Sequence, residues 1–217
     1  MKAIILDIDV LYFCCFKKVT STSLILTYLI PPFTTIRGLL SNILGYKRDD
    51  LSLQEKIKIG IMVKDFGFKN KELAKILKLK QAANYLPNPD FPSSPMFREF
   101  LVQPEYKIFI GGQGPIIEKL NVGFNDWARP IYLGQSDDLI DLKYSEIYDA
   151  KETETNIINS ALSSFSENTV IEKVPYRFGL DGKDIDYKIL SIPIEEKVEL
   201  TKTTKVFKIS DYFVELI

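Results

Sequence analysis

Two short stretches near the start of the chain combine hydroxyl groups with positive charges, and such groups bind phosphate. The first is a polar loop with two lysines and four hydroxyl side chains: Lys17, Lys18, Thr20, Ser21, Thr22 and Ser23. The second lies at the start of an expected helix and comprises Thr34, Thr35 and Arg37. The first turn of a helix offers unpaired backbone N–H groups and the positive end of the helix dipole. These residues predict a phosphate-binding surface, although hydroxyl-rich loops and threonine caps also occur without any ligand.

Arg37 is the unusual member of this group. The helix dipole favours acidic rather than basic side chains in the first turn. An anionic partner would resolve the conflict, whereas a surface arginine tolerated at a cost of a few tenths of a kcal/mol is the alternative.

A second candidate is the Asp-x-Asp pair formed by Asp7 and Asp9. It resembles the strand-borne motif of haloacid dehalogenase-type phosphatases, with Asp137 and Asp138 as a possible magnesium loop. In those enzymes the strand ends near the aspartates, whereas the residues from Val10 onward remain strand-like here, and the usual glycine and threonine are missing. The pair is better explained as part of an exposed sheet face, and Asp137-Asp138 as a structural turn.

The chain contains no histidine, which excludes Ser-His-Asp and Cys-His catalysis and all histidine-based metal sites. Catalysis would therefore depend on Tyr, Lys, Asp, Glu or a metal held by carboxylates. The two cysteines, Cys14 and Cys15, are adjacent and lack zinc-ligand spacing, so we expect them to be buried strand residues in a reduced compartment. We expect no catalytic residue, no metal and no cofactor.

The elements that would position these side chains follow from the spacing of apolar residues. Period-two alternation predicts strands over 4–16 and 57–64, and helical spacing predicts a helix over 36–44 that Thr34 or Thr35 caps and Gly45 ends. Residues 71–80 read as a short basic helix that runs into a proline-rich excursion. Beyond it we expect a strand pair interrupted at Pro104 over 97–112, a helix over 115–127, a loop over 129–142, and strands over 172–180, 186–194, 197–202 and 204–210.

This order predicts an α+β fold of the ferredoxin-like type with strand-rich extensions. We expect one domain over 1–217, with a thumb insertion over 68–96 and a strand-rich part over 170–217. Charge is unevenly distributed, because residues 1–110 carry 16 Lys and Arg against 10 Asp and Glu, whereas residues 111–217 carry 12 against 19. No apolar run is long enough for a membrane span and the start lacks signal-peptide features, so we expect a cytoplasmic protein without a membrane partner.

Several longer motifs carry a resemblance to a known family. The chain has a long first strand and a T-S-T-S-like loop, followed by PPFTTIRGLLSNILG, FREFLVQPEYKIFIGG and RPIYLGQSDDLIDL. In this order they resemble the fifth Cas family, the RAMP-superfamily subunit of type I CRISPR surveillance complexes (Cascade). The matching blocks cover roughly the first two thirds of the chain, and the strand-rich end matches loosely.

The resemblance implies a ferredoxin-like domain with a protruding thumb that binds the 5′ handle of the CRISPR RNA in antiviral defence. It also implies a place at one end of a filament of backbone Cas subunits beside the large Cas subunit, with target DNA reached only through the assembled complex. The implied RNA contacts are the hydroxyl and cationic residues above together with Arg98. On the thumb they are Lys75, Lys78, Lys80, Asn84 and Tyr85.

One branch of this family processes precursor CRISPR RNA with tyrosine, lysine and histidine at its site. Without histidine that set is incomplete, and tyrosine and lysine have ordinary pKa values near 10, which suit acid–base work poorly without strong tuning. We therefore expect a non-catalytic subunit. A metal-independent endoribonuclease remains the alternative, and a scaffold that binds protein but no RNA is the third.

Overall fold

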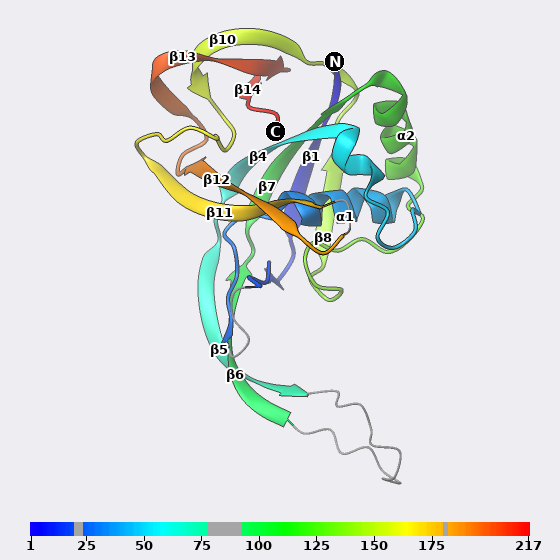
Figure 1. Ribbon diagram of the computed structural model, residues 1–217, viewed down its shortest axis with the longest axis vertical. Coiled ribbons are helices and arrows are strands. Elements are labelled where there is room, and N and C mark those ends of the chain that lie inside the picture. Colours follow the sequence, from blue (N-terminus) through cyan, green and yellow to red (C-terminus); the bar gives the residue numbers. More distant parts are fainter. Residues whose placement is uncertain (20–23, 78–92, 180–181) are drawn as a thin grey trace.

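A computed structural model describes residues 1–19, 24–77, 93–179 and 182–217. Its centre is an antiparallel sheet with the strand order β4-β7-β1-β8. The strands are β1 (Lys2–Val10), β4 (Ile57–Asp65), β7 (Glu105–Gly112) and β8 (Ile140–Tyr144), and the short β9 (Tyr148–Asp149) pairs with the start of β1. Two helices, α1 (Phe33–Ile43) and α2 (Gly114–Asn125), follow β1 and β7 in the chain (Figure 1).

Successive side chains along each strand point to opposite sides of the sheet, so the sheet has two different faces. On one face Ile4, Leu6 and Ile8 of β1 join a large core with the apolar sides of α1 and α2. On the other face Ala3 and Ile5 pack with residues near the end of the chain. Helix α1 contributes Ile36, Leu39, Leu40 and Ile43 to the large core, as the spacing of these residues predicts.

The second half of the chain is rich in strands. The strands β10 (Lys151–Ile158), β13 (Val198–Ile209) and β14 (Tyr212–Val214) form one sheet, and β11 (Thr169–Phe178) pairs with β12 (Ile185–Pro193). The inner face of β11 packs on α1, where the rings of Phe33 and Tyr176 lie 5.6 Å apart. A short 3-10 helix, η1 (Ser52–Glu55), leads into β4.

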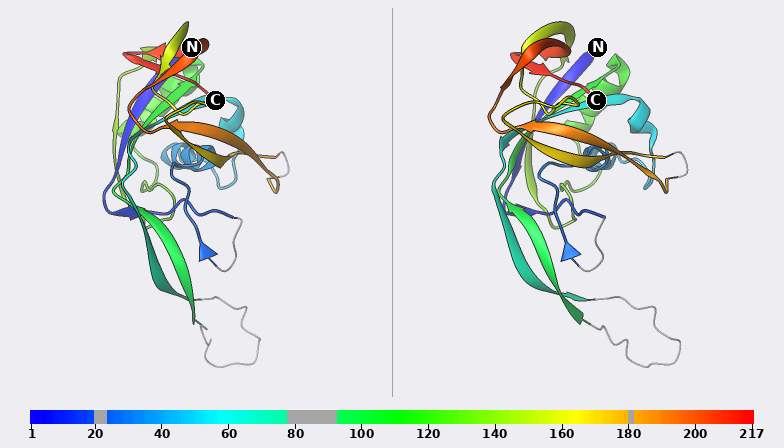
Figure 2. Two further views of the ribbon diagram at one scale, coloured as in Figure 1. Left: turned by 90° about the vertical axis from the view of Figure 1, so that its left-hand side faces the viewer. Right: turned by 60° about the vertical axis from the view of Figure 1, so that its left-hand side comes forward.

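A long hairpin projects from the body of the molecule (Figures 1 and 2). It consists of β5 (Phe68–Leu77) and β6 (Ser93–Val102), which pair from Phe68–Val102 to Leu77–Ser93. At its root, β2 (Phe13–Cys14) pairs antiparallel and β3 (Leu24–Ile25) parallel with β6. The hairpin leaves the central sheet after β4 and returns to it at β7.

The mixed helix-and-strand architecture was predicted at this coarse level, but several elements differ from expectation. The first strand ends at Val10, and Tyr12 is exposed, because the chain bends there and crosses to the hairpin sheet as β2. Residues 71–77 form part of β5 rather than a helix, because pairing with β6 overrides the helix-forming residues Lys, Glu, Leu and Ala.

Three smaller corrections concern individual elements. Helix α1 begins after Pro32 and has no side-chain cap, so Thr34 and Thr35 lie inside its first turn instead of capping it. The sequence analysis missed β8 and β10, and the two strands expected over 197–210 form the single long β13.

In the described part of the chain, no helix has the length and apolar character needed to cross a membrane.

Candidate nucleic-acid interface

The two lysines of the predicted loop have different surroundings. Lys17 is exposed, and its backbone forms an isolated antiparallel β-bridge with Thr27. Lys18 is half-buried, and its ammonium donates a hydrogen bond to the Glu172 carboxylate of β11 at 2.6 Å. Glu172 is itself buried and also accepts from the backbone N–H of Leu29 at 2.7 Å. Lys18 is thus neutralised by protein, and Lys17 is the described lysine of the loop that faces solvent. Thr20, Ser21, Thr22 and Ser23 lie outside the described residues.

Arg37 is buried, with 5% of its surface exposed. One guanidinium N–H donates to the carbonyl oxygen of Tyr176, and the guanidinium lies 5.2 Å from the centre of the Tyr176 ring. Its Nε has no hydrogen-bond partner, and among the described residues no carboxylate forms an ion pair with it. Burial lowers the pKa of Arg37, since removal from water disfavours the charged form. The predicted RNA contact at Arg37 stays a prediction, and β11 is the partner that the structure shows.

Arg37 lines a hollow of about 510 Å³ beside α1. Thr34, Gly38 and Ser41 lie on the same side of the helix and form one wall. The opposite wall comes from the segment that follows the helix and includes Lys47 and Arg48. Thr35 lies on an adjoining surface and lines a smaller hollow of about 200 Å³.

The lysines in the described part of the hairpin lie on one of its faces, whereas Arg98 lies on the other. Lys69, Lys71 and Lys75 alternate with residues of the other face, and Leu73 and Phe97 lie between them on the same side. Glu99 of β6 also lies on this face, and its carboxylate is 2.9 Å from the Lys69 ammonium. Phe97 is 49% exposed and Leu73 is 63% exposed, and the ammonium of Lys71 lies 4.4 Å from the centre of the Phe97 ring. Such a face offers both cations for phosphates and apolar surface for bases. Lys78, Lys80, Asn84 and Tyr85 lie outside the described residues.

Arg98 lies on β6, opposite Ile25 of β3 and Glu72 of β5. Its guanidinium is 4.0 Å from the Glu72 carboxylate and 5.7 Å from the centre of the Phe13 ring. Two of its nitrogens, Nε and one terminal nitrogen, are buried without a partner. Arg98 therefore lies close to the loop of Lys17 at the root of the hairpin, whereas Arg37 lies against β11.

Sequence reasoning missed a pairing between Tyr46 and Lys119. The Lys119 ammonium donates to the Tyr46 hydroxyl at 3.2 Å and lies 4.6 Å from the centre of its ring. Both residues line a second hollow of about 780 Å³, together with Lys56 and Lys58. A tyrosine after the helix and a lysine in the next helix carry no sequence signal that would connect them, because 72 residues separate them.

The acidic candidates are engaged in structural contacts. Asp7 accepts from Lys107 at 2.6 Å, and Lys64 lies 3.8 Å from Asp9 and 3.0 Å from Glu105. Asp7 and Asp9 lie on a sheet face, as the sequence analysis favoured over a phosphatase site, but both aspartates are half-buried rather than exposed. Within the described ranges, no group of three Cys, Asp or Glu residues has an arrangement that would hold a metal.

Asp138 has the structural role expected of the acidic turn. Its carboxylate accepts from the backbone N–H groups of Cys15 at 3.0 Å and Gln135 at 2.8 Å, and its side chain is buried. Burial raises the pKa of Asp138. Burial also raises the pKa values of Cys14 and Cys15, which are buried thiols as predicted.

The family model described as CRISPR-associated protein (Cas_Cas5) matches residues 9–185. The chain belongs to this family. The match begins at the end of β1, includes both helices and the hairpin, and ends at the start of β12. It therefore covers every described residue that is predicted to contact RNA in this Cas5-family chain.

Two solved structures share the fold of this Cas5-family chain. One is described as a CRISPR RNA-guided surveillance complex, with a TM-score of 0.58 and 12% identity over 95% of this chain and 91% of that chain. The other is described as a CRISPR protein from Archaeoglobus fulgidus, with a TM-score of 0.58 and 13% identity over 99% of this chain and 98% of that chain. No curated protein sequence matches the chain significantly.

Proposed function

We propose that this chain is a non-catalytic, RNA-binding subunit of a type I CRISPR interference complex (Cascade) that holds the 5′ handle of the CRISPR RNA. Membership in the CRISPR-associated family supports this function, as does the shared fold with a chain of an RNA-guided surveillance complex. In this proposal the protein acts in the cytoplasm in antiviral defence and caps a filament of backbone subunits beside the large subunit. It meets target DNA through the assembled complex.

The proposal includes a ferredoxin-like domain with a thumb. The succession β1, α1, β4, β7, α2, β8 and the antiparallel order β4-β7-β1-β8 support the first part. The hairpin β5–β6, which leaves the sheet between β4 and β7 and projects from the body, supports the second (Figure 1).

The observation that carries RNA binding is the basic face of the hairpin. Lys69, Lys71 and Lys75 share this face with the exposed side chains of Leu73 and Phe97. Single-stranded RNA is bound by cations that follow the backbone and by side chains on which bases stack. A handle that lies along this face would meet both.

The test is a filter-binding or anisotropy titration of the protein with labelled repeat RNA and with a scrambled RNA of equal length. Replacement of Lys69, Lys71 and Lys75 by Gln should weaken repeat binding and lower the salt slope by about 2 units, since each lost phosphate contact on a single strand accounts for about 0.7. The matched control replaces three exposed lysines of the β10–β13 sheet, Lys151, Lys202 and Lys205, and should leave both quantities unchanged. Equal affinity for the two RNAs would contradict the proposal.

A metal-independent endoribonuclease is the second candidate, and the Tyr46–Lys119 pair favours it. The two groups lie in hydrogen-bond contact beside an open hollow, so a tyrosine and a lysine could share a proton at one place. Incubation of the protein with repeat RNA in EDTA tests this activity. A defined cut that Tyr46→Phe abolishes without a loss of affinity would support the nuclease, and intact RNA would contradict it.

A further inference from the structure

The hollow beside α1 has a feature that protein contacts do not explain. Arg37 is buried in its floor, where it makes one hydrogen bond and one ring contact, both with Tyr176, but, among the described residues, no ion pair. A buried charge is costly unless a counter-charge or several hydrogen bonds compensate it. Glu55, whose charge acts on Arg37, is mostly exposed and lies near Arg177. Arg37 therefore lacks an anion within the described protein.

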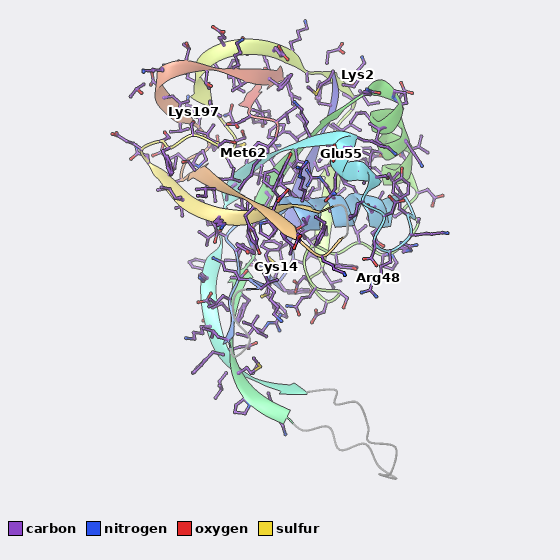
Figure 3. The ribbon with its side chains drawn as sticks, in the orientation of Figure 1. Lys2, Cys14, Arg48, Glu55, Met62 and Lys197 are labelled. Atoms are coloured by element: carbon purple, nitrogen blue, oxygen red, sulfur yellow. The ribbon has the colours of Figure 1, made fainter. Side chains whose placement is uncertain are left out.

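The walls of the hollow have a cationic excess. Lys47, Arg48 and Arg129 line it with Arg37, and Asp49 and Asp50 are its two acidic residues. Arg48 is almost fully exposed, lies 3.8 Å from Asp49, and extends outward beside the end of α1 (Figure 3). Asp50 accepts from the backbone N–H of Ser52, so part of its charge is used within its own turn. An anion that enters the hollow would meet more positive than negative groups.

The size and the remaining lining indicate more than an inorganic anion. A volume of about 510 Å³ falls within the range of about 300–1,000 Å³ that is typical of small-molecule sites. Tyr46 and Tyr132 contribute aromatic rings to the walls, and Gln54 closes one side through two hydrogen bonds with the backbone of Phe178. Thr34 places a hydroxyl in the first turn of α1, near the positive end of the helix.

We propose that this hollow binds one nucleotide, with the phosphate held by Arg37 and the first turn of α1 and the base against the tyrosine rings. The site goes beyond the proposed handle binding and does not depend on it. A free nucleotide and a nucleotide of a bound RNA present the same phosphate and base to the hollow. In this arrangement the phosphate supplies the missing partner of the Arg37 guanidinium.

Gly38 allows a test that spares the core. A Cβ at this exposed helical position would meet no atom within 4 Å, and Gly38 lines the hollow. Gly38→Phe should fill the hollow without disturbing α1. Val122→Phe is the matched control, because Val122 is exposed on α2 and is absent from the walls of the hollow. Arg37→Met removes the guanidinium while it keeps an apolar side chain of similar length in the floor.

The experiment is a calorimetric titration of the full chain with AMP, adenosine and inorganic phosphate. We expect AMP to bind at least tenfold more tightly than either of the others. Gly38→Phe and Arg37→Met should each weaken AMP binding at least tenfold, and Val122→Phe should change it less than twofold. Equal binding of AMP and adenosine, unchanged binding in Gly38→Phe, or no binding of AMP to the unaltered protein would overturn the site.

Competition with repeat RNA identifies the source of the nucleotide. If RNA displaces AMP, the site holds a nucleotide of the bound RNA, and if both bind together, it holds a free nucleotide. Failure of the handle proposal is recognised separately, because repeat and scrambled RNA would then bind equally while AMP binding persists. Loss of AMP binding in Gly38→Phe with full RNA affinity would leave both proposals in place as separate sites.

Discussion

Arg37 connects α1 to β11 through a single hydrogen bond and the packing of its stem, so its replacements should separate these contributions. Arg37→Ala should lower the free energy of unfolding by about 1–3 kcal/mol, because the Tyr176 carbonyl loses its donor and the stem loses its packing. Arg37→Met should lower it by less than about 1 kcal/mol, since removal of an uncompensated buried charge offsets the lost hydrogen bond. Urea unfolding measures both.

Arg48→Ala serves as the control for these two variants. Arg48 is exposed, so its removal should change the free energy of unfolding by less than about 0.5 kcal/mol. A stability of Arg37→Ala equal to that of Arg48→Ala would show that the bond to Tyr176 contributes nothing.

Asp138 makes stability depend on pH. Burial raises its pKa in the folded protein above the unfolded value, so the folded state binds the proton more tightly. The stabilisation from protonation is complete below the unfolded pKa of about 4 and is lost as pH rises through the higher folded pKa. Asp138→Asn should weaken this dependence while an amide oxygen still accepts from Cys15 and Gln135. Thermal unfolding of both proteins across pH 4–8 tests this, and parallel profiles would contradict it.

At the scale of elements, two glycines should respond in opposite directions to the same substitution. Gly38→Ala should raise the free energy of unfolding by about 0.5–1 kcal/mol, because alanine favours the helix and a Cβ has free space there. Gly60→Ala should lower it, because a Cβ on β4 would lie 2.3 Å from the Val214 side chain. Denaturant titration of the two variants gives the comparison. Destabilisation by Gly38→Ala would show that the hollow tolerates no added methyl group.

The elements that sequence reasoning identified are those whose local pattern and tertiary setting agree. Helix α1 has leucines and isoleucines at helical spacing, and they point into the core. Strand β4 alternates isoleucines with lysine and was predicted within one residue. The error at 71–77 arose because helix propensity is local, whereas the pairing of β5 with β6 joins residues far apart in the chain. Strand β10 was missed because its charged and hydroxyl residues have little apolar pattern.

The candidate site shows the same limit at the level of single residues. The sequence drew attention to Arg37 because an arginine is unusual in a first helical turn, and the structure places it in the wall of a hollow. The sequence could not show that Glu172, 154 residues away, neutralises Lys18. Partner choice depends on tertiary contacts, and these have no local signature.

At the scale of the whole molecule, residues from both halves of the chain share one core. Ile4 and Leu6 near the start pack in the same cluster as Val174, Leu190 and Ile217. We therefore expect a single cooperative unfolding transition, in agreement with the prediction of one domain. Fluorescence of Trp127, the only tryptophan, and far-UV circular dichroism should give the same midpoint in urea. Two separate midpoints would show that the strand-rich end unfolds by itself.

The path of the hairpin has a consequence for engineering. Asp65 at the end of β4 and Glu105 at the start of β7 lie opposite each other in the sheet, so the chain leaves and re-enters the body at adjacent points. A segment with such neighbouring ends can be shortened, lengthened or exchanged while the sheet keeps its register. A fluorescent reporter domain or a purification tag could replace the outer hairpin, and the body would then serve as a carrier whose fold is independent of its cargo.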